Sequence, residues 1–374
     1  MNDRAPRPVP AAAGASEVVA RVVREDVRAM KAYVVADASG MVKLDANESA
    51  YPPPADAHAR ALRALANVDM HRYPDGPARA VHAALLRALA LDAATGLILG
   101  NGSDELIGLI AMLVARPGAC IMAPEPTFVM YGVSARHAGV RFQGVPLRAD
   151  FTLDPAAMLA AIERERPAVI FIASPNNPTG VRYPDDPLER ILRAAPGLVV
   201  IDEAYAAFAD SAWLPRAAAY PNLLVMGTLS KIGMAGLRLG YAVGAPAWIA
   251  ELEKLRPPYN VNALTQAAAV ELLAQPDWIG ERAGAIRRER ERLATRLGAL
   301  PGVTVIPSQA NFVLVGIAHA ASIAEALKSR RVLVKQVAAM HASLADCLRI
   351  TVGTPQENDM LMTILTELCS GARR

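Results

Sequence analysis

The chain has 374 residues, of which 53% are hydrophobic and 20% charged, and its formal net charge is +3. This composition indicates a globular protein, excludes a disordered one, and suits one large domain with a smaller one. Basic blocks interleaved with aromatic residues are missing, and no apolar run approaches the roughly 20 residues of a membrane span, so neither a nucleic-acid nor a membrane partner is expected.

The cysteines are few and lie far apart, as Cys120, Cys347 and Cys369, without CxxC or Cys/His ligand spacing. We therefore expect neither a disulfide framework nor a metal site. The N-terminus is rich in Pro and Ala but lacks the apolar core of a secretory signal, which favours a cytoplasmic location. Residues 1–15 are predicted to form a mobile tail.

A helix is predicted from Ser16, and two Ala/Leu-rich helices follow a Pro-rich loop near residue 52. From Leu97 the chain alternates helical segments with short apolar runs, namely GLILG, ACIMAPEP, VRFQGVPL, AVIFIAS, GLVVIDEAY, NLLVMGTLSK and GYAVGAP. Such runs are typical of strands buried on both faces of a mainly parallel sheet, which predicts an α/β fold. The pattern changes again after Pro257, so we expect an N-terminal tail and arm (1–46), a large α/β domain (47–257) and a small α+β domain (258–374).

One lysine stands among residues that suit a pyridoxal phosphate (PLP) site. Lys231 follows Ser230 in GTLSKIGMAGLRLGY, and upstream lie Asn177 in SPNNPTG and both Asp202 and Tyr205 in VVIDEAY. PLP is held as a Schiff base by a lysine amine, and a carboxylate keeps its ring nitrogen protonated. Lys231 would bind the cofactor and then move a proton between substrate and cofactor.

These side chains follow predicted strands, and ligands of parallel sheets collect at the carboxyl ends of the strands. Asp202 ends a buried strand, where a carboxylate needs a partner such as the cofactor's ring N–H; the alternative is a cap for the next segment. Tyr205 and Asn177 could donate to the cofactor's phenolate oxygen, although Tyr205 could also be an ordinary core residue.

A phosphate group would need backbone N–H groups, hydroxyls and an arginine. The segment LILGNGSDELIGLIAMLV predicts a strand, a Gly-containing turn and a helix whose N-terminus could meet an anion. The alternative is a helix capped by its own Ser or Asp, with no ligand. The candidate phosphate residues are Gly102, Ser103, Asp104, Thr228, Ser230 and Arg238.

Two more residues have a functional and a structural interpretation. Phe128, in PEPTFVMY just after a strand, could stack on the cofactor ring or belong to the core. Arg349, on the apolar strand CLRITVG, could hold a substrate's carboxylate or phosphate, or form an internal salt bridge.

In order and spacing, SPNNPTG, DEAY, SK and GLRLGY resemble the aspartate aminotransferase superfamily, fold type I of the PLP enzymes. Over about residues 24–365, LDANESAYPP, HRYPDG, GNGSDELI and LRITVGTPQEN make the chain similar to the histidinol-phosphate aminotransferase family within the class II branch. The resemblance implies a large domain with a mainly parallel mixed sheet flanked by helices, a smaller α+β C-terminal domain, and PLP as cofactor.

The same resemblance implies a role for each cofactor residue. Lys231 matches the cofactor lysine, and Asp202 matches the carboxylate at the ring nitrogen. Asn177 and Tyr205 match the phenolate partners. Phe128 matches the stacking aromatic residue and Arg238 the phosphate arginine.

The resemblance further implies a homodimer with shared active sites, because Tyr73, in HRYP, matches a tyrosine that reaches the cofactor phosphate of the other subunit. Arg349 matches the arginine that holds the substrate's anionic end. Lys335 stands where several relatives carry arginine, and it keeps the charge but not the bidentate fork. Arg349, Asn177, Tyr51 and Lys335 are the substrate-binding candidates.

The activity implied is a ping-pong transamination in histidine biosynthesis. Glutamate donates its amino group, leaving 2-oxoglutarate, and imidazole-acetol phosphate becomes L-histidinol phosphate. Three alternatives stay open: an aminotransferase of the same branch acting on aromatic or other amino acids, a threonine-phosphate decarboxylase, and a catalytically silent PLP-binding or regulatory protein.

Overall fold

The computed structural model describes residues 13–32, 37–92 and 94–371. The chain divides into two compact units, Met1–Asp37 and Ala38–Arg374. The first contains helices α1 (Ala13–Val22) and α2 (Glu25–Arg28). Of the tail predicted for residues 1–15, residues 1–12 lie outside the described residues. Residues 13–15 belong to the start of α1 instead.

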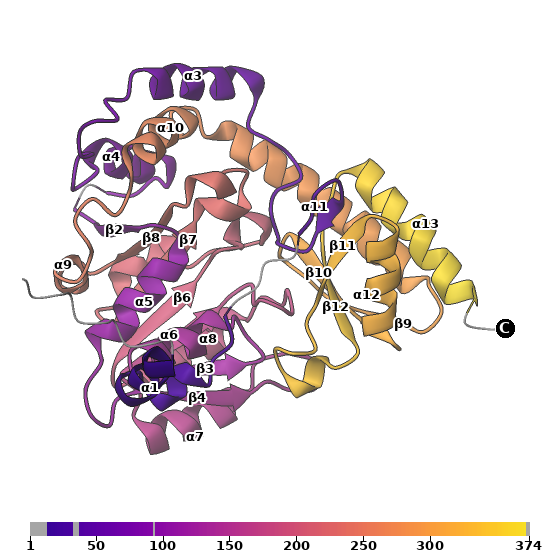
Figure 1. The fold of residues 1–374 in the computed structure, drawn as a ribbon, viewed down its shortest axis with the longest axis horizontal. Coiled ribbons are helices and arrows are strands. Elements are labelled where there is room, and N and C mark those ends of the chain that lie inside the picture. Colours follow the sequence, from indigo (N-terminus) through magenta and orange to yellow (C-terminus); the bar gives the residue numbers. More distant parts are fainter. Residues whose placement is uncertain (1–12, 33–36, 93, 372–374) are drawn as a thin grey trace, which may run out of the picture. The chain divides into compact units, whose positions relative to one another are not determined.

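A seven-stranded sheet of order β2-β8-β7-β6-β5-β3-β4 is the centre of the second unit (Figure 1). Neighbouring strands from β4 to β7 pair in parallel, and β8 runs antiparallel to both β7 and β2. The mainly parallel sheet predicted from the apolar runs is therefore confirmed, and so is the mixed sheet that the resemblance implies. The strands are β2 (Gly96–Gly100), β3 (Cys120–Glu125), β4 (Arg141–Pro146), β5 (Val169–Ala173), β6 (Leu198–Asp202), β7 (Leu223–Thr228) and β8 (Gly240–Gly244).

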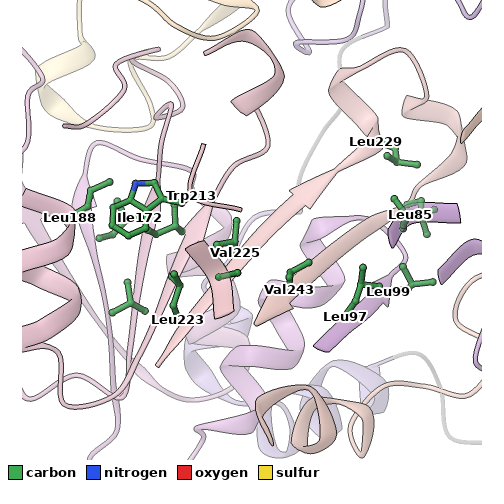
Figure 2. Close-up of a cluster of buried hydrophobic side chains, with 14 of the residues drawn as sticks. Leu85, Leu97, Leu99, Ile172, Leu188, Trp213, Leu223, Val225, Leu229 and Val243 are labelled. Carbon is green, nitrogen blue, oxygen red and sulfur yellow. The ribbon is translucent and has the colours of Figure 1, made fainter. Parts of the chain in front are cut away.

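Helices cover both faces of this sheet, because alternate residues of each strand point to opposite sides. One face packs against α3 (Ala55–Ala66), α4 (Arg79–Ala88), α7 (Pro155–Glu165), α8 (Asp185–Ala194) and α10 (Ala263–Leu273). The other packs against α5 (Ser103–Leu113), α6 (Met130–His137) and α9 (Pro246–Glu253). Figure 2 shows part of the first core, with Leu97, Leu99 and Val243 on the strands near Leu85 of α4.

A second sheet, of order β1-β11-β12-β10-β9, has its own core with α11 (Asp277–Gly298), α12 (Ala320–Ser329) and α13 (Pro355–Gly371). Its β1 pairs in parallel with β11, and the other pairs are antiparallel. The strands are β1 (Val42–Leu44), β9 (Val303–Ile306), β10 (Phe312–Ile317), β11 (Val332–Gln336) and β12 (Cys347–Thr351). The short 3₁₀ helices are η1 (Ala206–Phe208), η2 (Leu214–Ala219), η3 (Leu229–Lys231), η4 (Ala235–Leu237) and η5 (Ala342–Leu344).

The strand directions place several polar residues at one edge of the large sheet. β2, β5, β6 and β7 all point the same way, so the turns that follow them share the carboxyl edge. β1 belongs to the second sheet, and the residues just after it hydrogen-bond to residues of this edge. Within the described part of the chain, no helix has both the length and the apolar character that a membrane crossing needs.

Truncating a side chain of the sheet core should destabilise the protein. Leu223 of β7 is fully buried, so Leu223→Ala should lower the free energy of unfolding by about 2–5 kcal/mol. Met360→Ala on α13, where the side chain is 42% exposed, should change it by less than about 0.5 kcal/mol. Urea unfolding followed by circular dichroism checks both, and equal midpoints for the two variants would contradict this packing.

Candidate active site

Lys231 ends η3, directly after the central strand β7, and its side chain is half-buried. Its Nζ donates a hydrogen bond to the carbonyl oxygen of Ala46 at 3.2 Å. Burial, and secondarily the nearby positive charge of Arg349, lowers the pKa of this amine to about 8. About a tenth of the amine is therefore uncharged at pH 7, far more than for an ordinary lysine, and this is the form that attacks carbonyl groups.

Asp202 is the last residue of the neighbouring strand β6, and its carboxylate is buried. One oxygen, Oδ1, accepts from the backbone N–H of Ala204 at 3.0 Å, and Oδ2 accepts from the hydroxyl of Tyr131 at 2.7 Å. Burial raises the pKa of this carboxyl to about 6, against the opposing effect of the two hydrogen bonds. Asp202 thus holds the turn after β6 and keeps acceptor capacity for another donor.

Tyr205 lies three residues further on, buried with its ring edge-on to Phe312 at 5.1 Å between centroids. Its hydroxyl oxygen accepts a hydrogen bond from Nδ2 of Asn47 at 2.9 Å. Because Asn47 occupies an acceptor position of the oxygen, the hydroxyl proton is available for an acceptor in the site. Burial raises the pKa of Tyr205, so the phenol keeps that proton at neutral pH.

The segment 45–47 contacts three predicted site residues that come from different elements. Besides the contacts of Ala46 and Asn47 above, the carbonyl oxygen of Asp45 accepts from Nη2 of Arg349 at 2.6 Å. Asn47 adopts φ 55°, a left-handed conformation that Asn tolerates better than most residues. Sequence reasoning missed Asn47; the signal was its place in the LDANESAYPP motif, ahead of a loop rather than a strand end.

Arg349 on β12 and Asn177 after β5 join the two sheets. Nη1 of Arg349 donates to Oδ1 of Asn177 at 2.6 Å, and the guanidinium lies 5.4 Å from the ring centroid of Phe312. Lys335 on β11 is directly opposite Arg349 in the antiparallel ladder, so the two cationic side chains start from the same face of the sheet. This region is suited to an anionic group.

The predicted phosphate residues gather where β2 leads into α5. Arg238 donates from Nη1 to Oγ of Ser230 at 3.3 Å, and its Nη2 lies 3.7 Å from the Asp104 carboxylate. The hydroxyl of Thr228 donates to the same Ser230 oxygen at 3.0 Å. Gly102 has φ 83°, a backbone conformation that favours glycine, and a Cβ added there would lie 2.6 Å from Nη2 of Arg238, so the guanidinium lies directly against this residue.

The alternative of a helix capped by its own Ser or Asp is wrong for α5. Ser103 is already the first helical residue, the cap position is Gly102, and no side-chain capping hydrogen bond is formed there among the described residues. The first-turn amides and Arg238 therefore both face the space around Gly102, which is the donor set of an anion site.

Three predicted residues lie outside this hydrogen-bonded group. Tyr73 is 81% exposed and stacks on Tyr259 with 4.6 Å between ring centroids. Tyr51 is half-buried under the guanidinium of Arg282, 5.5 Å from its ring. Phe128 is half-buried and edge-on to Tyr131, the hydroxyl donor to Asp202, at 5.7 Å.

The chain is similar to known proteins in both sequence and fold. Residues 39–365 match the family model "Aminotransferase class I and II". The chain is 52% identical over 345 residues to histidinol-phosphate aminotransferase 2 of Burkholderia pseudomallei (92% of this chain, 97% of the relative). It is 53% identical over 347 residues to histidinol-phosphate aminotransferase 1 of Ralstonia nicotianae (91% and 93%). A crystal structure of histidinol-phosphate aminotransferase from Sinorhizobium meliloti, in complex with pyridoxal-5'-phosphate, superposes with a TM-score of 0.81 at 26% identity (94% and 98%).

The lowered pKa of Lys231 can be measured directly. In competitive acetylation of the apoprotein over a pH series, Lys231 should reach half of its maximal reactivity near pH 8. Lys43 should titrate above the usual lysine range, because its hydrogen bond to Glu48 raises its pKa. Mass spectrometry of the labelled peptides separates the two. Identical profiles for both lysines would contradict the burial of the Lys231 amine.

Proposed function

The chain belongs to the aminotransferase class I and II family, and we propose that within it the protein is a histidinol-phosphate aminotransferase. As a member of the family it is an enzyme that uses pyridoxal phosphate. The near-full-length similarity to two enzymes with this activity, at about half identical residues, carries the proposal. The reaction is L-histidinol phosphate plus 2-oxoglutarate giving imidazole-acetol phosphate plus L-glutamate.

The residues at the carboxyl edge fit this cofactor. A lysine amine of lowered pKa, a buried carboxylate and an uncapped helix N-terminus beside an arginine are the partners that its aldehyde, ring nitrogen and phosphate require. We assign Lys231 to the aldehyde, Asp202 to the ring nitrogen, and Tyr205 with Asn177 to the phenolate oxygen. Phe128 is assigned to the ring face. The phosphate is assigned to Gly102, Ser103, Asp104, Thr228, Ser230 and Arg238.

When bound, the cofactor supplies a protonated ring that withdraws electrons from the substrate's α-carbon. The protein's own residues do the rest. Nζ of Lys231 would take the proton from the substrate's α-carbon and pass it to the cofactor's side of the transfer, a role that its pKa of about 8 suits. Asp202 holds the proton on the ring nitrogen, and Tyr205 donates its hydroxyl proton to the phenolate oxygen.

Arg349 is proposed to hold the anionic end of both substrates. A guanidinium can donate two hydrogen bonds to either a carboxylate or a phosphate, so one residue can serve glutamate and histidinol phosphate in turn. Two of its acceptors, Oδ1 of Asn177 and the carbonyl oxygen of Asp45, are neutral groups. Lys335, across the strand pair, adds a second positive charge, and Tyr51 stays a substrate-binding candidate.

We propose a homodimer in which Tyr73 of each subunit completes the phosphate site of the other. Tyr73 and Tyr259 form an exposed aromatic pair, and exposed apolar surface of this kind favours contact with a partner. The domain limits at residues 47–257 and 258–374 and the cytoplasmic location stay predictions.

A half-reaction tests the activity. Mixing the loaded enzyme with L-histidinol phosphate alone should convert the cofactor's absorbance to that of its amino form, and 2-oxoglutarate should reverse the change. Lys231→Ala should lose steady-state turnover while keeping its circular dichroism spectrum. Conversion by glutamate but not by histidinol phosphate would favour another aminotransferase of the same branch. Carbon dioxide release without a keto acid would identify the decarboxylase, and no response to either amine would identify a silent protein.

Arg349→Ala should weaken the binding of both substrates. Losing one charge-assisted contact costs about 1.5–3 kcal/mol, so KM should rise roughly 10- to 100-fold for glutamate and for histidinol phosphate. Arg330→Ala is the matched control, because Arg330 is an exposed arginine paired with Glu367. A KM that changes for one substrate only would refute the shared anchor.

Hybrid dimers test the shared site. Lys231→Ala and Tyr73→Ala subunits should each have low activity alone. After mixing and subunit exchange, a hybrid dimer regains one site with both residues intact, about a quarter of all sites at equal mixing. Activity that stays at the mean of the two separate variants would refute the contribution of Tyr73 across the interface.

A further inference from the structure

Tyr131 is a buried tyrosine of α6 that the roles above leave out. Its side chain is fully buried, and its ring stacks on Phe171 of β5 at 4.7 Å between centroids with 4° between planes. The ring also packs against Phe128 in edge-to-face geometry, with 5.7 Å between the ring centroids. Held on these two sides, its hydroxyl donates to Oδ2 of Asp202 at 2.7 Å. The packing of its ring against two aromatic side chains therefore holds the Tyr131 hydroxyl in place beside the carboxylate.

The two hydrogen bonds of Asp202 divide its carboxylate evenly. The backbone N–H of Ala204 bonds to Oδ1 and Tyr131 to Oδ2, so rotation of the carboxyl group about its Cβ–Cγ bond would break both. Each ionised oxygen has two acceptor positions, so the pair of bonds leaves room for a further donor. The two bonds therefore fix the orientation of the Asp202 carboxylate and, with it, the direction from which a further donor can approach.

We propose that Tyr131 is a positioning residue that keeps the Asp202 carboxylate ionised and oriented toward the ring nitrogen of the cofactor. The inference rests on the proposed function, since it takes Asp202 as the partner of that nitrogen. Tyr131 touches neither substrate nor cofactor in this assignment and acts through Asp202.

The electrostatic balance at Asp202 supports this role. Burial raises the pKa of the carboxyl, and the hydrogen bond from Tyr131 is the largest opposing effect, ahead of the Ala204 amide. Only the ionised form can accept a charge-assisted bond from a protonated ring. Several titratable groups interact with this carboxyl through its charge or a hydrogen bond. They are Tyr131 on α6, Asp104 on α5, Lys231 on η3, Glu203 and Tyr205 after β6, and Tyr241 on β8.

The sign of the pH effect follows from the direction of the shift. In the folded protein the pKa of Asp202 is about 6, above its ordinary 3.8, so the contribution of this group to stability falls as the pH rises between these values. Without the hydrogen bond from Tyr131, the pKa of Asp202 in the folded protein rises further, so the loss of stability extends to higher pH. The destabilisation caused by Tyr131→Phe should therefore grow as the pH rises and Asp202 ionises.

The chain offers a matched control in Tyr183. Tyr183 is also fully buried, and its hydroxyl has no hydrogen-bond partner among the described residues. Tyr183→Phe removes the same atom from the same kind of environment, without touching a carboxylate. Any general cost of losing a buried hydroxyl is then measured separately.

The test is the affinity of the apoprotein for pyridoxal phosphate over a pH series, for wild type, Tyr131→Phe, Tyr183→Phe and Asp202→Ala. Near neutral pH, Tyr131→Phe should bind at least about tenfold more weakly, the size expected of one hydrogen bond to a charged group. The difference should shrink at higher pH, where the carboxyl is ionised in both proteins. Tyr183→Phe should bind like wild type at every pH.

Unfolding of the same apoproteins gives a second readout. The stability difference between wild type and Tyr131→Phe should increase with pH, and that of Tyr183→Phe should be constant. If Tyr131→Phe is less stable by a pH-independent amount and binds the cofactor like wild type, the residue is merely structural and the proposal is overturned. If Asp202→Ala also binds like wild type, the assigned role of Asp202 in the proposed function fails as well, which distinguishes the two failures.

Discussion

Burial of charged groups at the carboxyl edge of the seven-stranded sheet is the constraint on which the site depends. Removing a charge from water favours its neutral form, so burial moves the amine of Lys231 and the carboxyl of Asp202 in opposite directions, to pKa values of about 8 and 6. The amine becomes a usable nucleophile and base as a result. The carboxyl needs help to stay ionised, and the hydroxyl of Tyr131 and the amide of Ala204 provide it.

The contacts between the two sheets depend on the same edge. Arg349 comes from the second sheet and bonds to Asn177 of the first, while the segment 45–47 bonds to Lys231, Tyr205 and Arg349. Each of these bonds joins residues more than 150 positions apart in the chain. The substrate anchor and the proton-transferring lysine are thus held by one short stretch of backbone, so a shift of that stretch would move both.

Much of the fold and the residue types of the site could be predicted from the sequence. Strands buried on both faces are continuously apolar, and the short apolar runs identified all seven strands of the large sheet, including the edge strand β4, which is largely not buried. The motifs around Lys231, Asp202 and Asn177 were found because these residues lie at the end of a strand or in the turn that follows one. Asn47 and Tyr131 were missed, because one lies in a loop and the other in an ordinary amphipathic helix. Their roles come from partners 158 and 71 residues away.

By itself the sequence determined where the strands and turns lie, because backbone propensity and the burial pattern act over short distances. It also determined that a lysine, a carboxylate, a tyrosine and an arginine stand in or near those turns. Only the tertiary structure decided which of these meet. It set the parallel directions that bring the strand ends to one edge, the register that puts Lys335 opposite Arg349, and the position of the Arg238 guanidinium against Gly102, the cap of α5. Those outcomes depend on long-range packing and desolvation, which no local stretch of residues encodes alone.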